Sequence, residues 1–302
     1  MANCLVTGGC GFIGSHIVDK LIELGHNVKV IDDESAEQNE EFYYNPKARY
    51  YKLDISKDDC SYCFGGDDGH SMDYVFHLAA RSRIQPTIGS PGQCFEVNLV
   101  GTQRVLEWSR LNNVKRLIYS GTSSLYGHQN AIPFEPNMPA DCLNPYSMSK
   151  WMGEQVCKLY SQLYNFPSIV LRYFNVYGPR EPLKGEYAPV VGLFKRQSKA
   201  GEPMTIVSPG EQRRDFTYIS DVVDANISAM NSDVKKIPFN IYNVGTGKNH
   251  SMWDITKMIG GETQLIDARP AEVKETLADI DKTVKDLKWT PKFNLEDMIN
   301  SY

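Results

Sequence analysis

The sequence lacks both a long apolar run and an excess of basic residues. No apolar stretch approaches the roughly 20 residues of a membrane span, and MANCLVTGGC lacks the basic start and longer apolar core of a signal peptide. The formal charge is −5 at pH 7, and Lys and Arg are scattered, so no basic face for nucleic acid is expected. Seven cysteines, an odd number without framework spacing, fit a reduced compartment. We therefore expect a cytoplasmic protein that binds neither membranes nor nucleic acids.

The cysteines also include one CxxC motif, formed by Cys60 and Cys63, with His70 nearby. A zinc site needs a second pair of ligands at suitable spacing, and none follows. We expect no metal, and we interpret the segment as a surface loop that contains cysteine.

Three glycines near the start of the chain, Gly8, Gly11 and Gly14, follow the apolar run NCLVT in a GxxGxxG pattern. The first allows a tight turn, the second lets backbone approach a pyrophosphate, and the third lets helix and strand pack closely. The amphipathic segment FIGSHIVDKLIELG supplies a helix whose N-terminus favours phosphates. A second apolar run, NVKVID, ends in Asp32, where a carboxylate accepts the adenosine ribose hydroxyls and repels a 2′-phosphate. The unit predicts binding of NAD rather than NADP.

Tyr146 and Lys150 lie four residues apart in the predicted helix NPYSMSKWMGEQVCKLYSQLY. This spacing places both side chains on one helix face, one turn apart. The Lys150 ammonium would favour the phenolate of Tyr146, whose ordinary pKa of about 10 must fall before it acts as a base near neutrality. Upstream, the buried run LIYS ends in the polar cluster GTSS at 121–124, where a hydroxyl can hydrogen-bond a substrate oxygen.

Apolar runs alternate with helical patterns through the first 178 residues. The alternation predicts an α/β fold with a Rossmann-type doubly wound parallel sheet and ligands at the carboxyl ends of its strands. Asp54 follows one strand, where it could meet the adenine or only cap the strand end. After Pro179 the alternation loosens, so we expect an NAD-binding domain at 1–178 and a smaller, partly interleaved substrate lobe at 179–302. In the first part we expect further strands at 49–55, 73–80, 115–121 and 168–178, a long helix at 93–113 and a short or irregular crossover at 56–72. In the second part we expect helices at about 187–200, 219–231 and 251–259, and extended pieces at 205–207, 239–244 and 263–267.

Nine motifs in order resemble the extended short-chain dehydrogenase/reductase family, specifically its NAD-dependent sugar-nucleotide epimerases and dehydratases. They span nearly the whole chain: TGGCGFIG, Asp32, HLAA, NLVGT around Asn98, SGTSSLYG, YSMSK, LRYFNVYGPR, RRDFTYISDV and RPAEV. Any one could arise by chance, but nine with the family's order and spacing identify the chain as a member.

The resemblance implies a mechanism in which Tyr146, as phenolate, takes the proton of a sugar hydroxyl while the attached carbon passes hydride to the nicotinamide. Lys150 would hold the nicotinamide ribose and lower the pKa of Tyr146, and Thr122 would hydrogen-bond the reacting oxygen. NAD would be regenerated in each cycle and stay bound. We expect Phe174 beside the nicotinamide, and cofactor contacts from Gly8, Gly11, Phe12, Ile13, Gly14, Asp32, Asp54, Ile55, Leu78, Ala79, Ala80, Asn98, Tyr146, Lys150 and Tyr173.

The resemblance also implies a substrate site. Asn175, Arg214 and Arg269 match the residues that hold the diphosphate of the sugar nucleotide, and Arg213 is the less favoured partner. We place the uracil near Thr205 to Val207. Seven residues after the second arginine the 4-epimerases carry a size-limiting residue, here Thr276, which would admit an N-acetylated sugar or only pack the loop.

Ser123 and Ser124 bear on the type of reaction. The related 4,6-dehydratases carry Asp and Glu at these places, and the glucuronate decarboxylases usually carry Glu at the second. Without a carboxylate, proton transfer at C5 and C6 has no evident agent, which favours simple epimerisation.

The resulting prediction is a UDP-glucose or UDP-N-acetylglucosamine 4-epimerase that acts as a homodimer through the helices at about 92–112 and around Tyr146. Alternatives are an ADP-heptose 6-epimerase, which FNVYGPRE followed by KG also resembles, another dehydratase or decarboxylase of the family, and an inactive NAD-binding regulator. The presence of both Tyr146 and Lys150 argues against the last.

Overall fold

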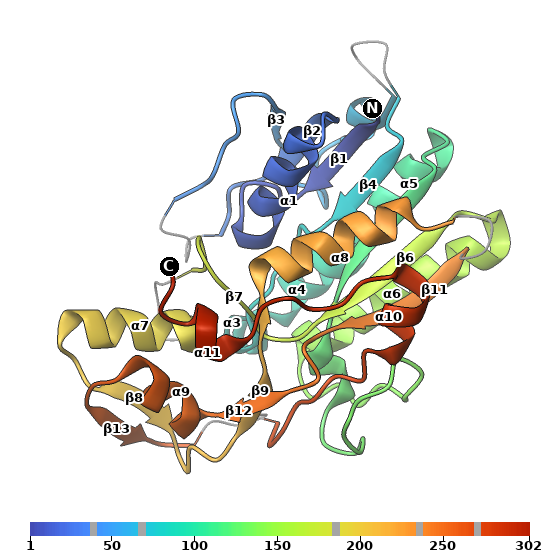
Figure 1. Cartoon of the computed structure of the whole chain (residues 1–302). Helices are drawn as coiled ribbons and strands as arrows, with labels where there is room; N and C mark the ends of the chain where they lie inside the picture. Colours follow the sequence, from blue (N-terminus) through green and yellow to red (C-terminus); the bar gives the residue numbers. More distant parts are fainter. Residues whose placement is uncertain (37–40, 66–70, 183–187, 234–237, 269–272) are drawn as a thin grey trace.

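The computed structural model describes residues 1–36, 41–65, 71–182, 188–233, 238–268 and 273–302. Its centre is a seven-stranded sheet with the order β11-β6-β5-β4-β1-β2-β3, in which every pairing is parallel (Figure 1). The strands are β1 Asn3–Thr7, β2 Asn27–Asp32, β3 Arg49–Lys52, β4 Tyr74–His77, β5 Arg116–Thr122, β6 Ser168–Tyr173 and β11 Phe239–Val244. The prediction of a doubly wound parallel sheet is confirmed. The strand order reverses between β1 and β4, which is where such sheets bind ligands.

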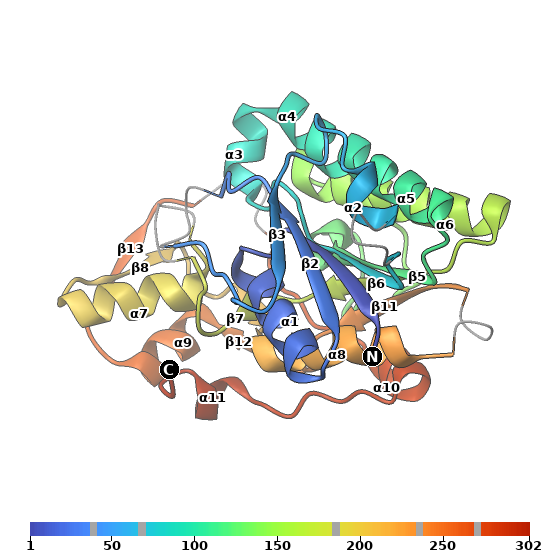
Figure 2. The same ribbon diagram turned by 90° about the horizontal axis from the view of Figure 1, so that it is seen from above.

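Helices cover both faces of the sheet (Figure 2). On one face lie α1 (Phe12–Glu23) and α8 (Ile219–Asn231); on the other lie α2 (Ser61–Gly65), α5 (Thr102–Leu111) and α6 (Pro145–Tyr164). Successive strand residues point to opposite faces, so Val6 joins the apolar cluster under α1 while Leu5 joins the cluster under α5 and α6. Because both faces are covered, the strands are apolar almost throughout, which explains why they appear as continuous runs in the sequence.

The segment predicted as one helix at 93–113 is helical but not uniform. It consists of α4 (Pro91–Phe95), a π-helical turn η1 (Glu96–Gly101) and α5. Within it the Thr102 hydroxyl donates to the Asn98 carbonyl oxygen at 2.6 Å. A single π turn of this kind is a local adjustment that often accompanies functional sites.

In its described residues, the crossover between β3 and β4 contains the five-residue α2 as its single helix, as expected from its irregular pattern. Cys60 and Cys63 are both fully buried in the cluster under α5, so the interpretation of this segment as a surface loop was wrong. Cysteine behaves here as a small apolar side chain. His70 lies outside the described residues.

A smaller lobe is built from helices α7 (Val190–Ala200) and α9 (Met252–Ile259) and from short strand pairs. The parallel pair is β8 (Met204–Val207) with β13 (Thr263–Ile266), and the antiparallel pair is β9 (Arg213–Asp215) with β12 (Asn249–Ser251). The helices and extended pieces expected after residue 179 are thus present. Strand β11 pairs with β6 and α8 packs on α1, so segments that follow residue 178 are interleaved with the first part in space.

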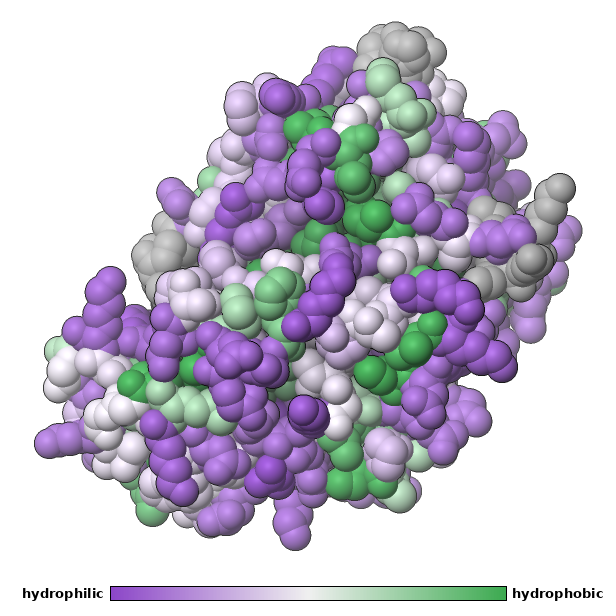
Figure 3. All heavy atoms as spheres, in the orientation of Figure 1, coloured by the Kyte–Doolittle hydropathy of each residue, from purple (hydrophilic) through white to green (hydrophobic). Residues whose placement is uncertain are grey.

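Shorter elements connect these layers. They are α3 (Ile84–Gly89), η2 (Ser123–Tyr126), β7 (Val176–Tyr177) paired with β10 (Thr217–Tyr218), α10 (Asp281–Leu287) and α11 (Leu295–Met298). Figure 3 shows a mostly polar face with hydrophobic residues in small separate patches. Within the described ranges, no helix combines the length and the apolar character needed to cross a lipid bilayer.

Candidate active site

A cavity of about 620 Å³ lies at the carboxyl ends of the strands and extends to the lobe. Its walls contain residues from every segment expected to bind cofactor or substrate. Of the predicted site residues within the described ranges, all except Asn98 and Phe174 line this cavity. Arg269 lies outside the described residues.

The glycine turn between β1 and α1 forms one wall. Gly8 has φ +72°, and a Cβ there would lie 2.7 Å from the Ala79 nitrogen. A Cβ on Gly14 would lie 2.1 Å from the Gly8 carbonyl oxygen, so the strand and the helix can approach this closely only without a side chain. Helix α1 begins after Gly11 without a side-chain cap, which leaves its first N–H groups at the cavity wall. The turn could therefore hold a pyrophosphate.

Asp32 ends β2 beside that turn. Its carboxylate accepts hydrogen bonds from the backbone N–H groups of Cys10 at 2.9 Å and Glu34 at 2.8 Å. Burial raises the pKa of Asp32, and these two bonds oppose the shift. The side chain is therefore held at the cavity edge by the backbone, with acceptor capacity left for hydroxyl groups.

Asp54 occupies an analogous place after β3. One carboxylate oxygen accepts from the Ser56 N–H and hydroxyl at 2.8 and 2.6 Å, and the other lies 3.1 Å from the Lys57 ammonium. The capping role was one of the two roles considered for this residue. It also lines the cavity, so the two roles are compatible.

The start of helix α6 is fixed by residues that favour a helix N-terminus. Asn144 and Ser147 form a reciprocal capping box, and Pro145 occupies the first turn. This start places Tyr146 in the first turn and Lys150 one turn later, and both line the cavity. The Lys150 ammonium also lies 4.1 Å from the centroid of the Tyr119 ring.

The pKa of Tyr146 is shifted in the opposite direction to the one expected from the sequence. Burial raises its pKa; a hydrogen bond with Thr122 and then the positive charge of Arg83 oppose that shift. Burial also lowers the pKa of Lys150 to about 8, while Glu154 one turn further along α6 opposes the change. The predicted depression of the Tyr146 pKa is therefore absent in the protein alone, because the site is poorly solvated and needs further positive charge.

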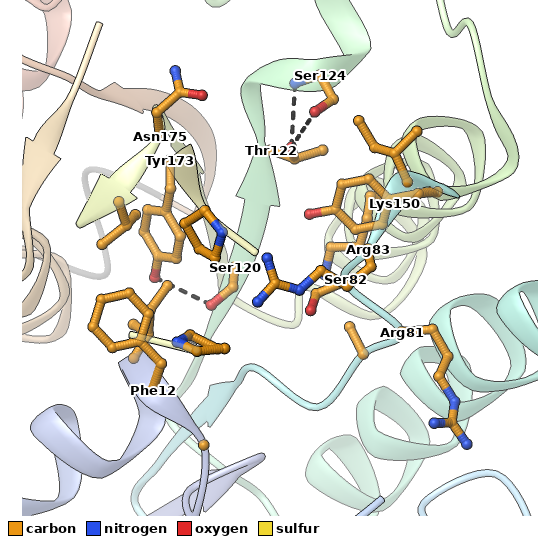
Figure 4. Close-up of a pocket in the computed structure, with 18 of the residues that line it drawn as sticks. Phe12, Arg81, Ser82, Arg83, Ser120, Thr122, Ser124, Lys150, Tyr173 and Asn175 are labelled. Atoms are coloured by element: carbon orange, nitrogen blue, oxygen red, sulfur yellow. Dashed lines mark hydrogen bonds between the residues drawn. The ribbon is translucent and has the colours of Figure 1, made fainter. Parts of the chain in front are cut away.

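Strand β5 delivers the hydroxyl cluster. Thr122 ends the strand, and its oxygen accepts from the Ser124 N–H at 3.2 Å as η2 begins (Figure 4). Ser123 and Ser124 both line the cavity. Hydroxyl groups, and no carboxylate, therefore follow Thr122 at the catalytic wall.

Behind this wall lies an ion pair that the sequence did not reveal. Glu154 on α6 and Arg172 on β6 are almost completely buried and are joined by bonds of 2.7 and 3.1 Å. Arg172 also donates to the Tyr126 hydroxyl at 2.9 Å. The pair joins β6 and η2 to the helix of Tyr146 and Lys150, with both charges compensated.

The lobe supplies the opposite wall. Asn175 donates to the Asp215 carbonyl oxygen at 2.8 Å, and Thr276 lies 3.4 Å from the same amide nitrogen. Arg214 on β9 lines the cavity, whereas the Arg213 side chain contacts Asn249 and Asp254. Two further lining residues, Thr205 and Val207, come from β8. Phe174 does not line the cavity; it is fully buried in a cluster with Tyr126 and Phe134.

Asn98 acts indirectly. It is 1% exposed, and its side chain holds the loop after β4 by accepting from the Arg81 N–H at 2.7 Å and donating to the Arg81 carbonyl at 3.1 Å. It also donates to the Ser149 hydroxyl on α6 at 3.0 Å. The expected direct cofactor contact is not supported, since the π turn directs this amide to the loop. That loop carries Arg83 into the cavity, and no motif in the sequence indicated this residue.

The described residues hold no group of three or more His, Cys, Asp or Glu side chains arranged to bind a metal ion.

Comparisons with known proteins agree with this geometry. The sequence profile of the NAD dependent epimerase/dehydratase family matches residues 4–245 of this chain. A putative UDP-glucose 4-epimerase of Methanocaldococcus jannaschii is 36% identical over 302 residues, covering 98% of this chain and 95% of the relative. The structure of a Thermotoga maritima UDP-glucose 4-epimerase with UDP-glucose has a TM-score of 0.91 and 32% identity, covering 98% of this chain and 96% of that one. A UDP-N-acetylglucosamine 4-epimerase from Methanobrevibacter ruminantium, in complex with UDP-N-acetylmuramic acid, also has a TM-score of 0.91, with 30% identity and coverage of 99% and 96%.

Proposed function

The chain belongs to the NAD-dependent epimerase/dehydratase family, and we propose that it interconverts UDP-sugars that differ in configuration at C4. The substrates are UDP-glucose and UDP-galactose, or their N-acetylated counterparts. The names of similar proteins include a UDP-glucose 4-epimerase and a UDP-N-acetylglucosamine 4-epimerase. The observation that carries the proposal is the meeting of Tyr146, Lys150 and Thr122 at one wall of the cavity, with hydroxyls and no carboxylate at the next two positions.

The residues present fit NAD, because the Gly8 and Gly14 turn leaves a cradle that side chains would fill, and Asp32 stands beside it. NAD, when bound, accepts a hydride from the sugar carbon and returns it. The chain's own residues orient it: the N–H groups at the start of α1 face its phosphates, Asp32 its adenosine ribose and Lys150 its nicotinamide ribose.

Proton transfer is the task of Tyr146. Its phenolate takes the C4 hydroxyl proton and later returns one, while Thr122 hydrogen-bonds the same sugar oxygen. Burial favours the neutral phenol, and the positive charge of Arg83 opposes this effect. Lys150, one turn further along α6, supplies a second positive charge that favours the phenolate. On the opposite wall, Asn175 and Arg214 bind the diphosphate, which leaves the sugar free to turn between transfers.

The wall formed by Thr122, Ser123 and Ser124 is less suited to catalysing elimination or decarboxylation. Removal of a C5 proton needs a second acid–base group, and Ser123 and Ser124 have no accessible charge near neutrality. Simple epimerisation needs only the single proton carrier that the wall provides.

The test is turnover by the purified protein with no added NAD. UDP-glucose and UDP-N-acetylglucosamine are offered separately, products are identified by NMR, and bound nucleotide is measured after denaturation. We expect formation of the C4 epimer, and a fall in kcat of about 10²- to 10⁴-fold in Tyr146→Phe.

The matched control is Tyr160→Phe on the same helix. The Tyr160 hydroxyl accepts from Gln103 at 3.0 Å and lies outside the cavity wall, so this variant should keep its activity. If protein that carries NAD turned over neither sugar, C4 epimerisation would be the wrong assignment, and ADP-heptose would be tested next.

We further propose that the protein is a homodimer formed through α5 and α6. These two helices contact one another, and exposed apolar residues are found on η1, α5 and α6, namely Val100, Leu111, Leu159 and Leu163. Covering such residues is the usual reason for helix pairing between subunits. Light scattering should give twice the chain mass; a monomer at micromolar concentration would contradict this.

A further inference from the structure

Glu154 lies on α6 one turn beyond Lys150, so the two side chains share a helix face. It is the single acidic residue of this helix. Lys150 is 3% exposed and Glu154 is fully buried, so solvent screens their interaction weakly. A Cβ on Gly121 would lie 3.0 Å from the Glu154 Oε1 atom, which places the carboxylate directly behind β5, the strand that ends in Thr122. A buried carboxylate thus lies behind the catalytic wall.

The Glu154 carboxylate is held from the side of β6 by Arg172, which donates two hydrogen bonds at 2.7 and 3.1 Å. Burial raises the pKa of Glu154, and the charges of Arg172 and then Lys150 oppose that shift. Two bonds between a guanidinium and a carboxylate are the geometry of an ion pair, so Glu154 is ionised. The buried set therefore contains two cations, Lys150 and Arg172, and one anion. Lys282 on α10 is a further cation, whose charge interacts with Asp286 and with Arg172.

The other titratable groups around Lys150 carry no charge near neutral pH. Burial raises the pKa of the Cys94 thiol, and it lowers the pKa of His77 to about 3. Burial also raises the pKa of the Tyr119 phenol, whose ring centroid lies 4.1 Å from the Lys150 ammonium. Three further neighbours that burial keeps neutral are Tyr126, Cys142 and Cys157. Among the described groups that act on the charge of Lys150, Glu154 is therefore the one anion.

Tyr146 and Lys150 hold one proton between them when the site is ready to accept a proton from the sugar. This proton has two possible placements: phenolate with ammonium, or phenol with amine. Both contain the same number of protons, so the solution pH does not choose between them. Burial favours the second, because it raises the pKa of Tyr146 and lowers that of Lys150 to about 8. Two charges favour the first: Arg83 acts on Tyr146, and Glu154, one turn from Lys150 and two from Tyr146, acts on Lys150.

We propose that Glu154 is a positioning residue that keeps the shared proton on Lys150 and thereby leaves Tyr146 as the phenolate. Glu154 does not line the cavity, whereas Tyr146 and Lys150 do, so it acts through Lys150 and touches neither sugar nor cofactor. The bonds from Arg172 keep the buried carboxylate ionised for this role. This inference deepens the proposed epimerase function and rests on it.

The experiment follows the two proton carriers in NAD-loaded protein without substrate. NMR of protein labelled at lysine Cε reports the titration of Lys150, whose signal is assigned by its loss in Lys150→Met. Ultraviolet difference absorbance against Tyr146→Phe reports the phenolate. In Glu154→Gln the midpoint of the Lys150 titration should fall by about 1 to 2 pH units, and the phenolate absorbance near neutral pH should decrease. With UDP-sugar, kcat should fall by about 10- to 100-fold, while KM changes little because Glu154 touches no ligand.

Glu154→Gln also leaves Arg172 without a charged partner, so two further variants separate charge from packing. A double variant, Glu154→Gln with Arg172→Met, replaces the ion pair with uncharged side chains of similar volume. Its Lys150 midpoint should stay low, because Arg172 is not among the charges that act on Lys150. The matched control is Arg172→Lys, which weakens the pair but keeps both charges, and its Lys150 midpoint should equal that of the wild type. An unchanged midpoint in Glu154→Gln, or a return to the wild-type midpoint in the double variant, would overturn the proposal.

Failure of the epimerase function can be told apart from failure of this inference, because the NMR and absorbance measurements need no turnover. If no UDP-sugar were converted but the Lys150 midpoint still fell in Glu154→Gln and in the double variant, the control of proton placement would stand without the reaction. If the sugar were converted and the Lys150 midpoint did not respond, the epimerase function would stand and the role of Glu154 would be rejected.

Discussion

The two walls of the cavity are built in different ways. The cofactor wall consists of backbone: a glycine turn, a helix start and the ends of parallel strands in one sheet. The lobe wall consists of short strand pairs tied by side chains, with Asp215 as the main tie; its carboxylate accepts from the N–H groups of Thr246, Gly247 and Ala278 at 2.8 to 3.1 Å. The first wall should therefore be sensitive to added atoms, and the second to lost hydrogen bonds.

The strongest test of this difference is Gly14→Ala. The new Cβ would lie 2.1 Å from the Gly8 carbonyl oxygen, so the backbone of the turn must move. We expect loss of bound NAD and a fall in the free energy of unfolding of about 3 kcal/mol or more, at the upper end for overpacking against backbone. Nucleotide content and urea denaturation measure the two effects.

Gly92→Ala controls for the loss of a glycine. A Cβ there has no atom within 4 Å, so NAD content and stability should match those of the wild type. Normal NAD retention in Gly14→Ala would mean that the cofactor wall is not limited by backbone contact.

The cofactor wall could be predicted from the sequence because its signals are local. The three glycines and Asp32 lie within one strand–turn–helix–strand unit, and the capping residues of α6 lie next to Tyr146. Such features depend on a few neighbouring residues and survive in any context that forms the sheet. The same holds for the strands, whose apolar runs reflect burial on both faces.

The lobe wall and the ion pairs could not be predicted in this way. Arg83 enters the cavity because α3 packs on α6, and Glu154 meets Arg172 across 18 residues of chain. Likewise β11 has an ordinary strand pattern, and nothing in it shows that it returns to β6. These arrangements depend on tertiary packing, which the pattern of a single segment does not contain.

Glu181 allows a second test, at the junction between the sheet layer and the lobe. It is 5% exposed, accepts from the Tyr302 hydroxyl at 2.8 Å, and burial raises its pKa to about 7. The folded state thus holds this proton more tightly than the unfolded state, so stability is greatest below the unfolded pKa and is lost as pH rises through the folded one. Between pH 5.5 and 8.5 Glu181 should cost about 2 kcal/mol of unfolding free energy.

The measurement is denaturant unfolding at several pH values in the wild type and in Glu181→Gln. The variant keeps the acceptor for Tyr302 and cannot ionise, so its stability should decline less toward alkaline pH. Glu202→Gln, at an exposed site, should follow the wild-type curve. Parallel curves for the wild type and Glu181→Gln would show that this junction does not depend on the buried acid.

The smallest expected effect concerns Thr276. The sequence left two roles possible for this residue: limiting the size of the sugar, or only packing the loop. Its hydroxyl accepts from the buried Asp215 N–H at 3.2 Å and lies 3.4 Å from the Asn175 amide nitrogen. Thr276→Val keeps the volume and removes the hydroxyl, so an unpaired N–H should cost about 1 to 2 kcal/mol of stability and loosen Asn175, raising KM several-fold. Thr276→Ser keeps the hydroxyl and should retain the wild-type stability. If Thr276 acted by size alone, the order would reverse: Thr276→Val would match the wild type, and Thr276→Ser would shift the preference toward the larger, acetylated sugar.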